Sequence, residues 1–450
     1  MNSKRYEIDM LNGPLMPRLI TFALPLMMSS VLQLLFNAVD IIVVGNFTGS
    51  SALAAVGSTT ALINIYTNLF IGMSMGVNVL SARKYASGAY QEMSRAVHTG
   101  ITFALICGAI MVFVGLFFSR PSLALMGTPD DVIDQSVLYM RIYFCGMPFF
   151  MIYNYGAAVL RAVGDTQRPL IILTAAGIVN ALLNLFLVIV FSLGVAGVAI
   201  ATVISQAISC VLVLRCLMTS TGPYHLDLRR LHIDKASLIA ICQIGIPTGV
   251  QGIVISFSNA LLQSSVNSFG SVAMAGYTAA NNILGFLYMA VNSITQASMS
   301  FTSQNLGAGK LKRIDRILID CLILEFMTAF IMGGLAFIFG RQLLGIYTTE
   351  EEVVKMGMQI ASVTYIPYFF CGFMDMFPGI MRGVGYAFVP MILSMIGTVG
   401  VRILWIFFYF PSHRSLQELF LSYPMSWIVT FILQIICFYF VRKLIWKKYG

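Results

Sequence analysis

Long apolar runs alternate with short polar segments along the whole of this 450-residue chain. Each run is long enough to cross a bilayer as a helix, which takes roughly 20 apolar residues. A transmembrane barrel would show shorter segments of alternating polarity, and the sequence lacks that pattern. The sequence therefore predicts an all-α polytopic membrane protein. Its twelve transmembrane helices are expected near residues 15–44, 52–81, 96–118, 135–159, 169–191, 195–217, 237–265, 272–303, 317–339, 354–378, 389–410 and 416–441.

The composition agrees with a chain whose surroundings are mostly hydrocarbon. Hydrophobic residues make up 58% of it and charged residues 10%, and the mean hydropathy is +0.86. The net charge of +9 reflects basic residues in loops on one predicted face, and short cytoplasmic loops carry such an excess. Both termini are therefore expected in the cytoplasm, with the tail that contains Lys4 and Arg5 retained rather than cleaved as a signal peptide. No loop joins a basic stripe to aromatic residues, which argues against nucleic-acid binding.

Cysteine and histidine give no sign of a disulfide framework or a metal centre. The eight cysteines fall almost entirely inside predicted spans and form no CxxC pair, so they are expected to pack as small apolar residues. The four histidines show no ligand spacing. The sequence therefore predicts no cofactor.

The second half of the chain repeats the first. An offset of 221 carries Gly49-Ser50 to Gly270-Ser271, and "LRAVGDTQRP" (160–169) to "MRGVGYAFVP" (381–390). Pro25 and Pro247 correspond at an offset of 222. Because each repeat holds six spans, an even number, the two repeats are parallel, an architecture found in secondary transporters. We expect an N-terminal six-helix lobe at 1–220, a cytoplasmic linker at 221–236 and a C-terminal six-helix lobe at 237–450.

These motifs resemble those of a known family. The stretch "LPLMMSSVLQLLFNAVDIIVVGNFTGSSALAAVG", the two repeated loops and "FTSQNLGAGK" after the eighth span are similar to sequences of the MATE (multidrug and toxic compound extrusion) transporters. The resemblance extends from about Leu15 to Phe440. It implies a monomeric antiporter of two lobes in a bacterial cell membrane, which expels amphipathic, often cationic drugs in exchange for H⁺ or Na⁺.

Asp40 is an acid inside an apolar span. A helix of 3.6 residues per turn places Gln33, Asn37 and Asp40 on one face. A carboxylate at bilayer depth costs about 3 kcal/mol on insertion scales. We therefore expect this face to point into the interior of the lobe.

Polar residues on two other spans could surround Asp40. Asn180 and Asn184 are spaced i and i+4 on the fifth span, and Thr202 and Gln206 share a stripe of the sixth. The pocket would carry one formal negative charge, suited either to taking up a proton or to replacing the water shell of Na⁺. The resemblance implies a cation site at Asp40, Asn180, Asn184 and Thr202, although many relatives carry aspartate where this chain has Asn184.

The C-terminal half offers a second candidate acid. Asp375 lies at mid-span, seven residues before Arg382, and the offset of 221 relates it to Asn154. A transport role and a structural partnership with an interior donor both stay open for Asp375. Glu325 is expected to snorkel towards the cytoplasmic end of its span. Further polar residues that could line a substrate cavity, or satisfy one another between helices, are Gln251, Asn281 and Asn282.

Three more residues raise questions that the sequence leaves open. Pro25 removes a backbone hydrogen bond from the helix that carries Asp40, so it could act as a hinge or as a fixed kink. Arg141 is expected to snorkel near the outer end of its span, while Arg402 lies deeper and its role is open.

Other classes of function fit less well. The chain lacks the Walker A pattern GxxxxGK[ST], so direct use of ATP is not expected. No paired catalytic carboxylates, nucleophile elbow or histidine cluster indicate an enzyme. The alternative is a flippase for a lipid-linked or other amphiphilic substrate, which would favour a cavity rich in arginine and lysine.

Overall fold

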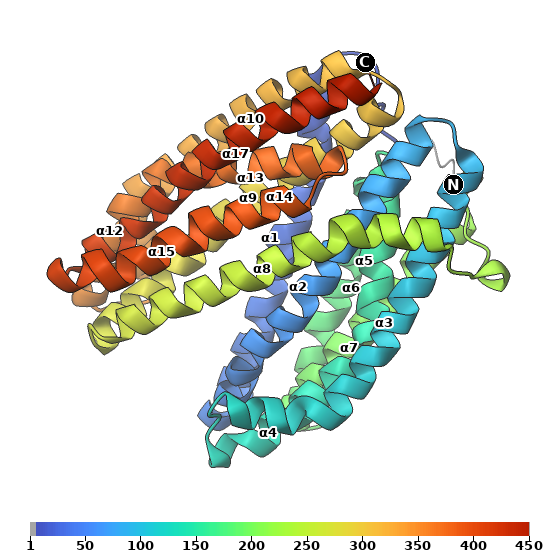
Figure 1. Cartoon of the computed structure of the whole chain (residues 1–450). Coiled ribbons are helices and arrows are strands. Elements are labelled where there is room, and N and C mark those ends of the chain that lie inside the picture. Colours follow the sequence, from blue (N-terminus) through green and yellow to red (C-terminus); the bar gives the residue numbers. More distant parts are fainter. Residues whose placement is uncertain (1–5, 450) are drawn as a thin grey trace. The chain divides into compact units, whose positions relative to one another are not determined.

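The computed structural model describes residues 6–449, except for the side chains at positions 50, 53 and 61. Lys4 and Arg5, part of the predicted cytoplasmic tail, lie outside these residues. Within the described part the regular structure is helical, without strands (Figure 1). The first half contains α1 (Leu15–Thr48), α2 (Ser50–Ala86), α3 (Tyr90–Leu125), α4 (Asp130–Cys145), α5 (Met147–Ala162), α6 (Gln167–Leu185), η2 (Phe186–Val190), α7 (Gly194–Met218) and η3 (Leu228–Arg230).

The second half repeats this order of helices. It contains α8 (Lys235–Asn267), α9 (Ser271–Gly307), α10 (Leu311–Ile338), α11 (Gly340–Gly345), α12 (Glu351–Thr364), η4 (Ile366–Tyr368), α13 (Phe369–Gly383), α14 (Phe388–Ser394), η5 (Met395–Gly400), α15 (Val401–Leu404), η6 (Trp405–Tyr409), η7 (Phe410–Ser412), α16 (Leu416–Phe420) and α17 (Ser422–Tyr449). Each predicted span coincides with one of these helices or runs of helices, and the fold class predicted from the sequence is confirmed.

The helices fold into two compact units. Unit 1 comprises residues up to Asp9 and Met28–Ile246, and unit 2 comprises Met10–Met27 and Pro247–Gly450. Each unit has its own apolar core, which extends from Val43 to Ile241 in unit 1 and from Leu262 to Trp427 in unit 2. The units divide α1 and α8 close to Pro25 and Pro247, whereas the predicted lobes keep these helices whole. The lobe boundaries stay a prediction.

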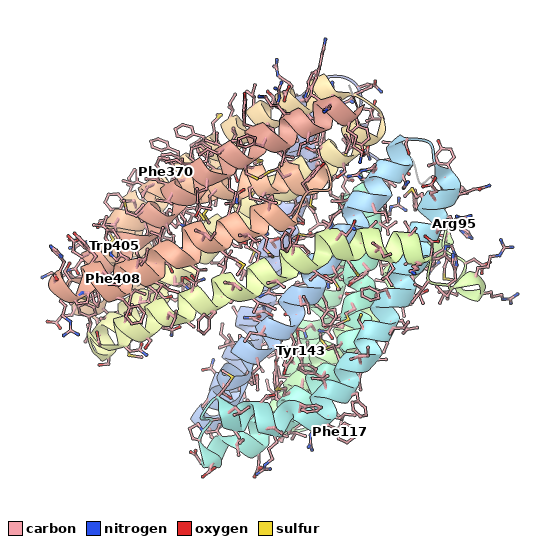
Figure 2. All side chains as sticks on the ribbon, viewed as in Figure 1. Arg95, Phe117, Tyr143, Phe370, Trp405 and Phe408 are labelled. Atoms are coloured by element: carbon pink, nitrogen blue, oxygen red, sulfur yellow. The ribbon has the colours of Figure 1, made fainter. Side chains whose placement is uncertain are left out.

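The membrane spans are recognisable by length and composition. Nine helices of the described chain are long and apolar enough to cross a bilayer, and two bent pairs bring the number to 11. The remaining span is α9, which is 37 residues long but carries many buried polar residues. Outward-facing aromatic rings suit contact with lipid: Phe117 on α3 is 61% exposed and Phe408 on η6 is 76% exposed (Figure 2).

Two spans that the sequence predicts as continuous are broken. α4 and α5 meet at an angle of 46°, and α12 and the segment that begins at Ile366 meet at 45°. Pro148 and Pro367 lie in the first turn after each break. A proline has no N–H to donate and clashes with the preceding turn, so a helix restarts there instead of running through. The sequence predicts both spans, and the structure adds a bend in each that the apolar pattern does not reveal.

The polar connection between α7 and α8 is anchored to unit 1. The backbone N–H of Asp227 donates to Nε2 of His98 at 3.2 Å, and that of Asp234 donates to Oγ1 of Thr99 at 2.9 Å. Hydrogen bonds from Ser237 hold the pKa of the Asp234 carboxyl below its usual value. The connection is therefore held to α3 at two points.

Candidate cation site

Asp40 and the two asparagines of α6 lie together in unit 1. The side-chain amide of Asn184 donates to Oδ1 of Asp40, and it also lies 3.3 Å from Oδ1 of Asn180. Both asparagines are buried, while Asp40 is half-buried. Asn184 precedes η2, a π-helical segment, by two residues. Such segments widen a helix and are frequent at functional sites.

An amide oxygen in this cluster lacks a hydrogen-bond partner. Asn184 directs its N–H group at Asp40, and its Oδ1 is buried without a donor. Oε1 of Gln206 is likewise buried and unpartnered. Buried carbonyl oxygens normally accept a hydrogen bond, and leaving one unmade costs free energy. These two oxygens are therefore available to a cation or to a donor that enters the cluster.

Thr202 adds a hydroxyl oxygen from α7. Its side chain interacts with the Asp40 carboxylate, and Oγ1 donates to the backbone oxygen of Val198 at 3.0 Å. A hydroxyl has one proton and two lone pairs. While the proton points to Val198, a lone pair stays free to accept from a donor or to bind a cation.

Two tyrosines that the sequence analysis missed also surround Asp40. Tyr139 and Tyr143 lie one turn apart on α4, with ring centroids 6.1 Å apart, and both interact electrostatically with Asp40. Tyr143, marked in Figure 2, also forms a side-chain hydrogen bond with Gln206. Their i, i+4 spacing was the available signal, but tyrosines on an apolar helix usually indicate packing or an interface.

The other predicted residues of the first half lie outside this cluster. Gln33 and Asn37 are exposed, although they share the predicted face with Asp40. Asn154 donates to the backbone oxygen of Phe150 at 2.8 Å, as a residue satisfied within its own helix does. Pro25 belongs to the part of α1 that is in unit 2.

The second half brings together a different set of residues. Asp375 is half-buried on α13 and interacts electrostatically with Arg382, which in turn donates to Oε1 of Gln251 at 2.8 Å. Asn281 and Asn282 are exposed. Glu325 is fully buried. The expectation that Glu325 snorkels was wrong, because its side chain turns inward onto α13 instead of following the helix surface outward.

The two arginines that lie inside predicted spans differ in their surroundings. Arg141 is exposed. Arg402 is 3% exposed, donates to Asn259 at 2.8 Å and to Ser426 at 3.3 Å, and lies over the ring of Tyr423 at 4.1 Å. These are neutral partners that satisfy the guanidinium group by hydrogen bonds and cation–π contact.

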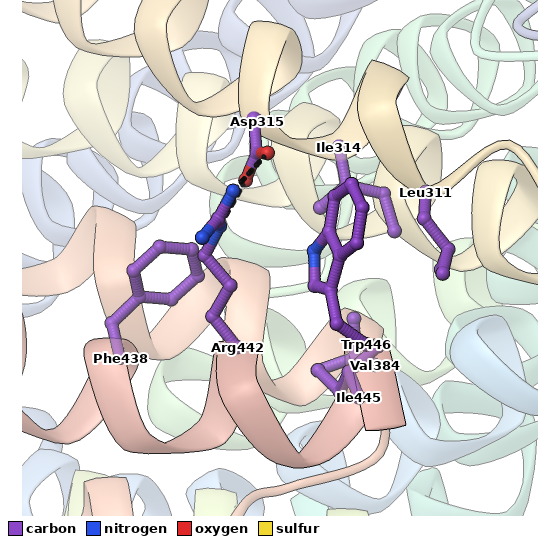
Figure 3. A pocket seen from close by; sticks show the side chains of 8 residues that line it. All are labelled: Leu311, Ile314, Asp315, Val384, Phe438, Arg442, Ile445 and Trp446. Atoms are coloured by element: carbon purple, nitrogen blue, oxygen red, sulfur yellow. Dashed lines mark hydrogen bonds and ion pairs between the residues drawn. The ribbon is translucent and has the colours of Figure 1, made fainter. Parts of the chain in front are cut away.

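A pocket in unit 2 lies away from all of these residues. It contains the Asp315–Arg442 ion pair, in which two N–H groups of the arginine donate to the carboxylate at 2.8 Å each (Figure 3). Its lining consists of Leu311, Ile314, Asp315, Val384, Phe438, Arg442, Ile445 and Trp446. Since no predicted site residue lines it, this pocket is not the candidate site.

The sequence model of the MatE family matches residues 25–186 and 247–408. The chain belongs to the MatE family. The model matches both halves in the same direction, and the two matches start 222 residues apart, at Pro25 and Pro247, which confirms the parallel internal repeat. Together with the helices described above, membership identifies a multi-pass membrane protein.

Individual relatives cover nearly the whole chain. The "Probable multidrug resistance protein YoeA" of Bacillus subtilis is 29% identical over 436 residues, which are 95% of this chain and 93% of the relative. The "Multidrug export protein MepA" of Staphylococcus aureus is 22% identical over 396 residues, 88% of this chain and 87% of the relative. A crystal structure of a MATE protein in complex with MaL6 superposes with a TM-score of 0.91 at 19% identity, covering 98% of this chain and 99% of that one.

Proposed function

We propose that this protein is an efflux antiporter that exchanges amphipathic drugs for a cation by alternating access. Membership of the MatE family and the names of its relatives support drug export. The Asp40 cluster supports cation coupling, because it combines one carboxylate with unpartnered amide oxygens inside a membrane span. The proposal includes a position in the bacterial cell membrane with both termini in the cytoplasm, action as a monomer, and transport rather than enzymatic chemistry.

The charge of the cluster sets what it can exchange. A lone carboxylate in a span is stabilised by a bound cation or by a proton, and either one removes its net charge. Na⁺ would require Asn184 to turn its amide, so that Oδ1 faces the ion and joins oxygens of Asp40, Asn180 and Thr202. A proton would leave the present arrangement in place. Both ions stay open, and the experiment below separates them.

The test is efflux of a fluorescent amphipathic cation from proteoliposomes. A Na⁺ gradient and a pH gradient are applied separately to the wild-type protein and to Asp40→Asn. We expect one gradient to drive efflux in the wild type and to fail in Asp40→Asn, since an amide carries no charge to neutralise. The matched control is Asp134→Asn, which changes an exposed acid paired with Arg120 at 2.9 Å and should leave efflux unchanged.

Two results would contradict the proposal. Gradient-driven efflux that survives in Asp40→Asn would remove Asp40 from the coupling step. Absence of efflux under either gradient in the wild type would make flipping of an amphiphilic or lipid-linked substrate the reading to test next.

In this proposal, Pro25 links cation binding at Asp40 to the conformation of α1. It lies in α1, close to the residues where that helix passes from unit 2 to unit 1, and Pro247 lies at the corresponding point of α8. Because proline interrupts the hydrogen-bond ladder, occupation of Asp40 could change the bend of α1. We expect Pro25→Ala to slow efflux and weaken its ion dependence. Unchanged ion dependence in that variant would contradict the hinge.

A further inference from the structure

Unit 2 contains a buried acid that the proposed mechanism does not use. Glu325 lies in the middle of α10 with no exposed surface. Its Oε1 accepts a hydrogen bond from Thr295 of α9 at 3.5 Å, while its Oε2 is buried without a partner. A charged carboxylate with an oxygen left unpaired in a low-dielectric interior is far more costly than the neutral acid. Glu325 is therefore placed to hold a proton.

Glycines of α13 bring the neighbouring helices close to this acid. A Cβ added at Gly372 would lie 2.6 Å from Cγ and 2.7 Å from Cδ of Glu325. A Cβ added at Gly379 would lie 2.7 Å from Cγ2 of Thr295. Distances below 3.0 Å are not tolerated without movement, so both positions need glycine. The carboxyl of Glu325 is thus packed directly against the backbone of α13.

The same face of α13 carries the second acid. Asp375 follows Gly372 by three residues, nearly one helical turn, and Arg382 follows Asp375 by two turns. Asp375 interacts electrostatically with both Glu325 and Arg382, and Tyr288 of α9 also lies within electrostatic range of Asp375. Other titratable groups around the pair are Cys321 on α10, Cys371 on α13 and Tyr368 on η4.

The charged groups of this cluster carry a net charge of −1 before any proton binds. Glu325 and Asp375 supply two negative charges and Arg382 one positive charge, so a single bound proton makes the cluster neutral. Na⁺ would bring the same charge but needs several oxygen ligands, whereas a proton satisfies the one unpartnered oxygen of Glu325. Asp375 is only half-buried, whereas Glu325 has no exposed surface. Asp375 is therefore the more accessible of the two acids.

The internal repeat shows that this cluster is specific to unit 2. The offset of 221 relates Glu325 to Ala104, Gly372 to Met151 and Asp375 to Asn154. Ala104 and Met151 are both fully buried. In unit 1 the third span carries the small Ala104 and the fourth span the large Met151. In unit 2 the sizes are reversed, with the large Glu325 on the third span of the repeat and Gly372 on the fourth. Glycine at 372 leaves space for the carboxyl group of Glu325, whereas the corresponding positions of unit 1 hold Met151 and Ala104.

We propose that Glu325 and Asp375 share one exchangeable proton, forming a proton-binding site in unit 2 that is separate from the Asp40 cluster. The proposal rests on the proposed antiport function for its physiological meaning, but proton binding itself can be measured without transport. In an antiporter this site would add a proton-dependent step to the cycle even when the ion bound at Asp40 is Na⁺.

The experiment measures the carboxyl group directly. Infrared difference spectra of the full-length protein in lipid are recorded as a function of pH, using the carbonyl stretch of the protonated carboxyl group. Asp40→Asn serves as the background, because it removes the contribution of unit 1. We expect a titrating band in this background that falls to baseline on adding Glu325→Gln and also on adding Asp375→Asn. Gln keeps an oxygen that can accept from Thr295, and so preserves the packing.

The control is Asp320→Asn, on the same helix. Asp320 is also buried, but its carboxylate is paired with Arg316 at 3.0 Å, so replacing it should leave the band unchanged. A band that is absent from the Asp40→Asn background, or one that persists after Glu325→Gln, would overturn the proposal. These results do not depend on drug efflux, so failure of the antiport proposal would be recognised separately.

Discussion

In unit 1 a single acid, Asp40, is surrounded by amides, a hydroxyl and tyrosines, whereas in unit 2 two acids share a helix interface with an arginine. Asp40 has no acidic counterpart in unit 2, because the offsets of 221 and 222 relate it to Leu261 and Leu262. Conversely, Ala104 and Asn154 of unit 1 stand where unit 2 has Glu325 and Asp375. Each unit has thus placed its acids on different helices of a common scaffold, and a bound cation is expected to act differently in each.

The comparison also teaches how a buried charge is accommodated. Asp40 is half-buried and keeps unpartnered oxygens near it, an arrangement that can accept an ion. In unit 2 the positive charge that compensates the acids comes from the side chain of Arg382. In the proposed mechanism the cluster of unit 1 therefore takes either a metal ion or a proton, whereas that of unit 2 takes a proton.

The largest effect is expected from removing that compensating charge. Arg382→Met should lower the free energy of unfolding by on the order of 3 kcal/mol, because it leaves the buried Glu325 and the half-buried Asp375 without a cation. Arg161→Met is the matched control, since Arg161 occupies the repeat-related position on a helix that carries Asn154 where unit 2 has Asp375. Thermal unfolding in detergent measures both. Equal losses in the two variants would contradict the charge argument, and Arg382→Met/Asp375→Asn should recover part of the loss.

The second largest effect is expected from filling the space that Gly372 leaves for Glu325. Gly372→Ala should destabilise the protein by about 1–3 kcal/mol, because its Cβ would overlap Glu325. Adding Glu325→Ala should relieve that overlap, so the double variant should be more stable than the sum of the single changes predicts. Gly334→Ala on α10 has open space around it and should be close to neutral. Additive effects in the cycle would show that the two positions do not share their space.

A second carboxylate beside Asp40 would test whether the cluster of unit 1 binds Na⁺. Asn184→Asp should lower the Na⁺ concentration for half-maximal efflux about tenfold, which corresponds to about 1.4 kcal/mol of added attraction for the ion. Asn154→Asp places the new charge elsewhere in unit 1 and should not reproduce the effect. An unchanged dependence of efflux on Na⁺ concentration in Asn184→Asp would show that residue 184 does not contribute to Na⁺ binding.

The smallest effect is expected from the hydroxyl of Thr202. Thr202→Val keeps the shape of the side chain but removes an oxygen, which should weaken the ion response of efflux about fivefold. Ser205→Ala removes the neighbouring buried hydroxyl, which donates to the backbone oxygen of Thr202 at 2.8 Å, and should have less effect. A larger loss in Ser205→Ala than in Thr202→Val would indicate a packing role instead.

The sequence predicts the helices well because the apolar runs are long and the repeat checks each one against another. Helical spacing placed Asn180 and Asn184 on one face of their span. That they lie beside Asp40 was expected from the cost of a charge in the membrane and from the resemblance to MATE transporters. Two spans are broken, with a proline in the first turn after each break, and the hydropathy of a run does not reveal where a helix restarts. Spacing also could not show which way the exposed Gln33 and Asn37 would turn.

Glu325 shows where sequence reasoning failed most clearly. Its position along α10 suggested a side chain reaching towards water, but its burial depends on Gly372 of another helix, 47 residues away. The same holds for Tyr139 and Tyr143, whose relation to Asp40 depends on how α4 packs within unit 1. Contacts of this kind are set by tertiary packing, and a single sequence carries no local signal for them.

The most direct test of the central claim, that Asp40 couples drug movement to a cation, is the reverse flux. Proteoliposomes are loaded with the amphipathic cation and diluted into drug-free buffer, with no initial ion gradient, and H⁺ and Na⁺ movements are followed with indicators inside the vesicles. We predict that outward drug flow drives one of these ions inward in the wild type, and that Asp40→Asn abolishes the ion movement. Drug flow without ion movement in the wild type, or ion movement that persists in Asp40→Asn, would contradict the account.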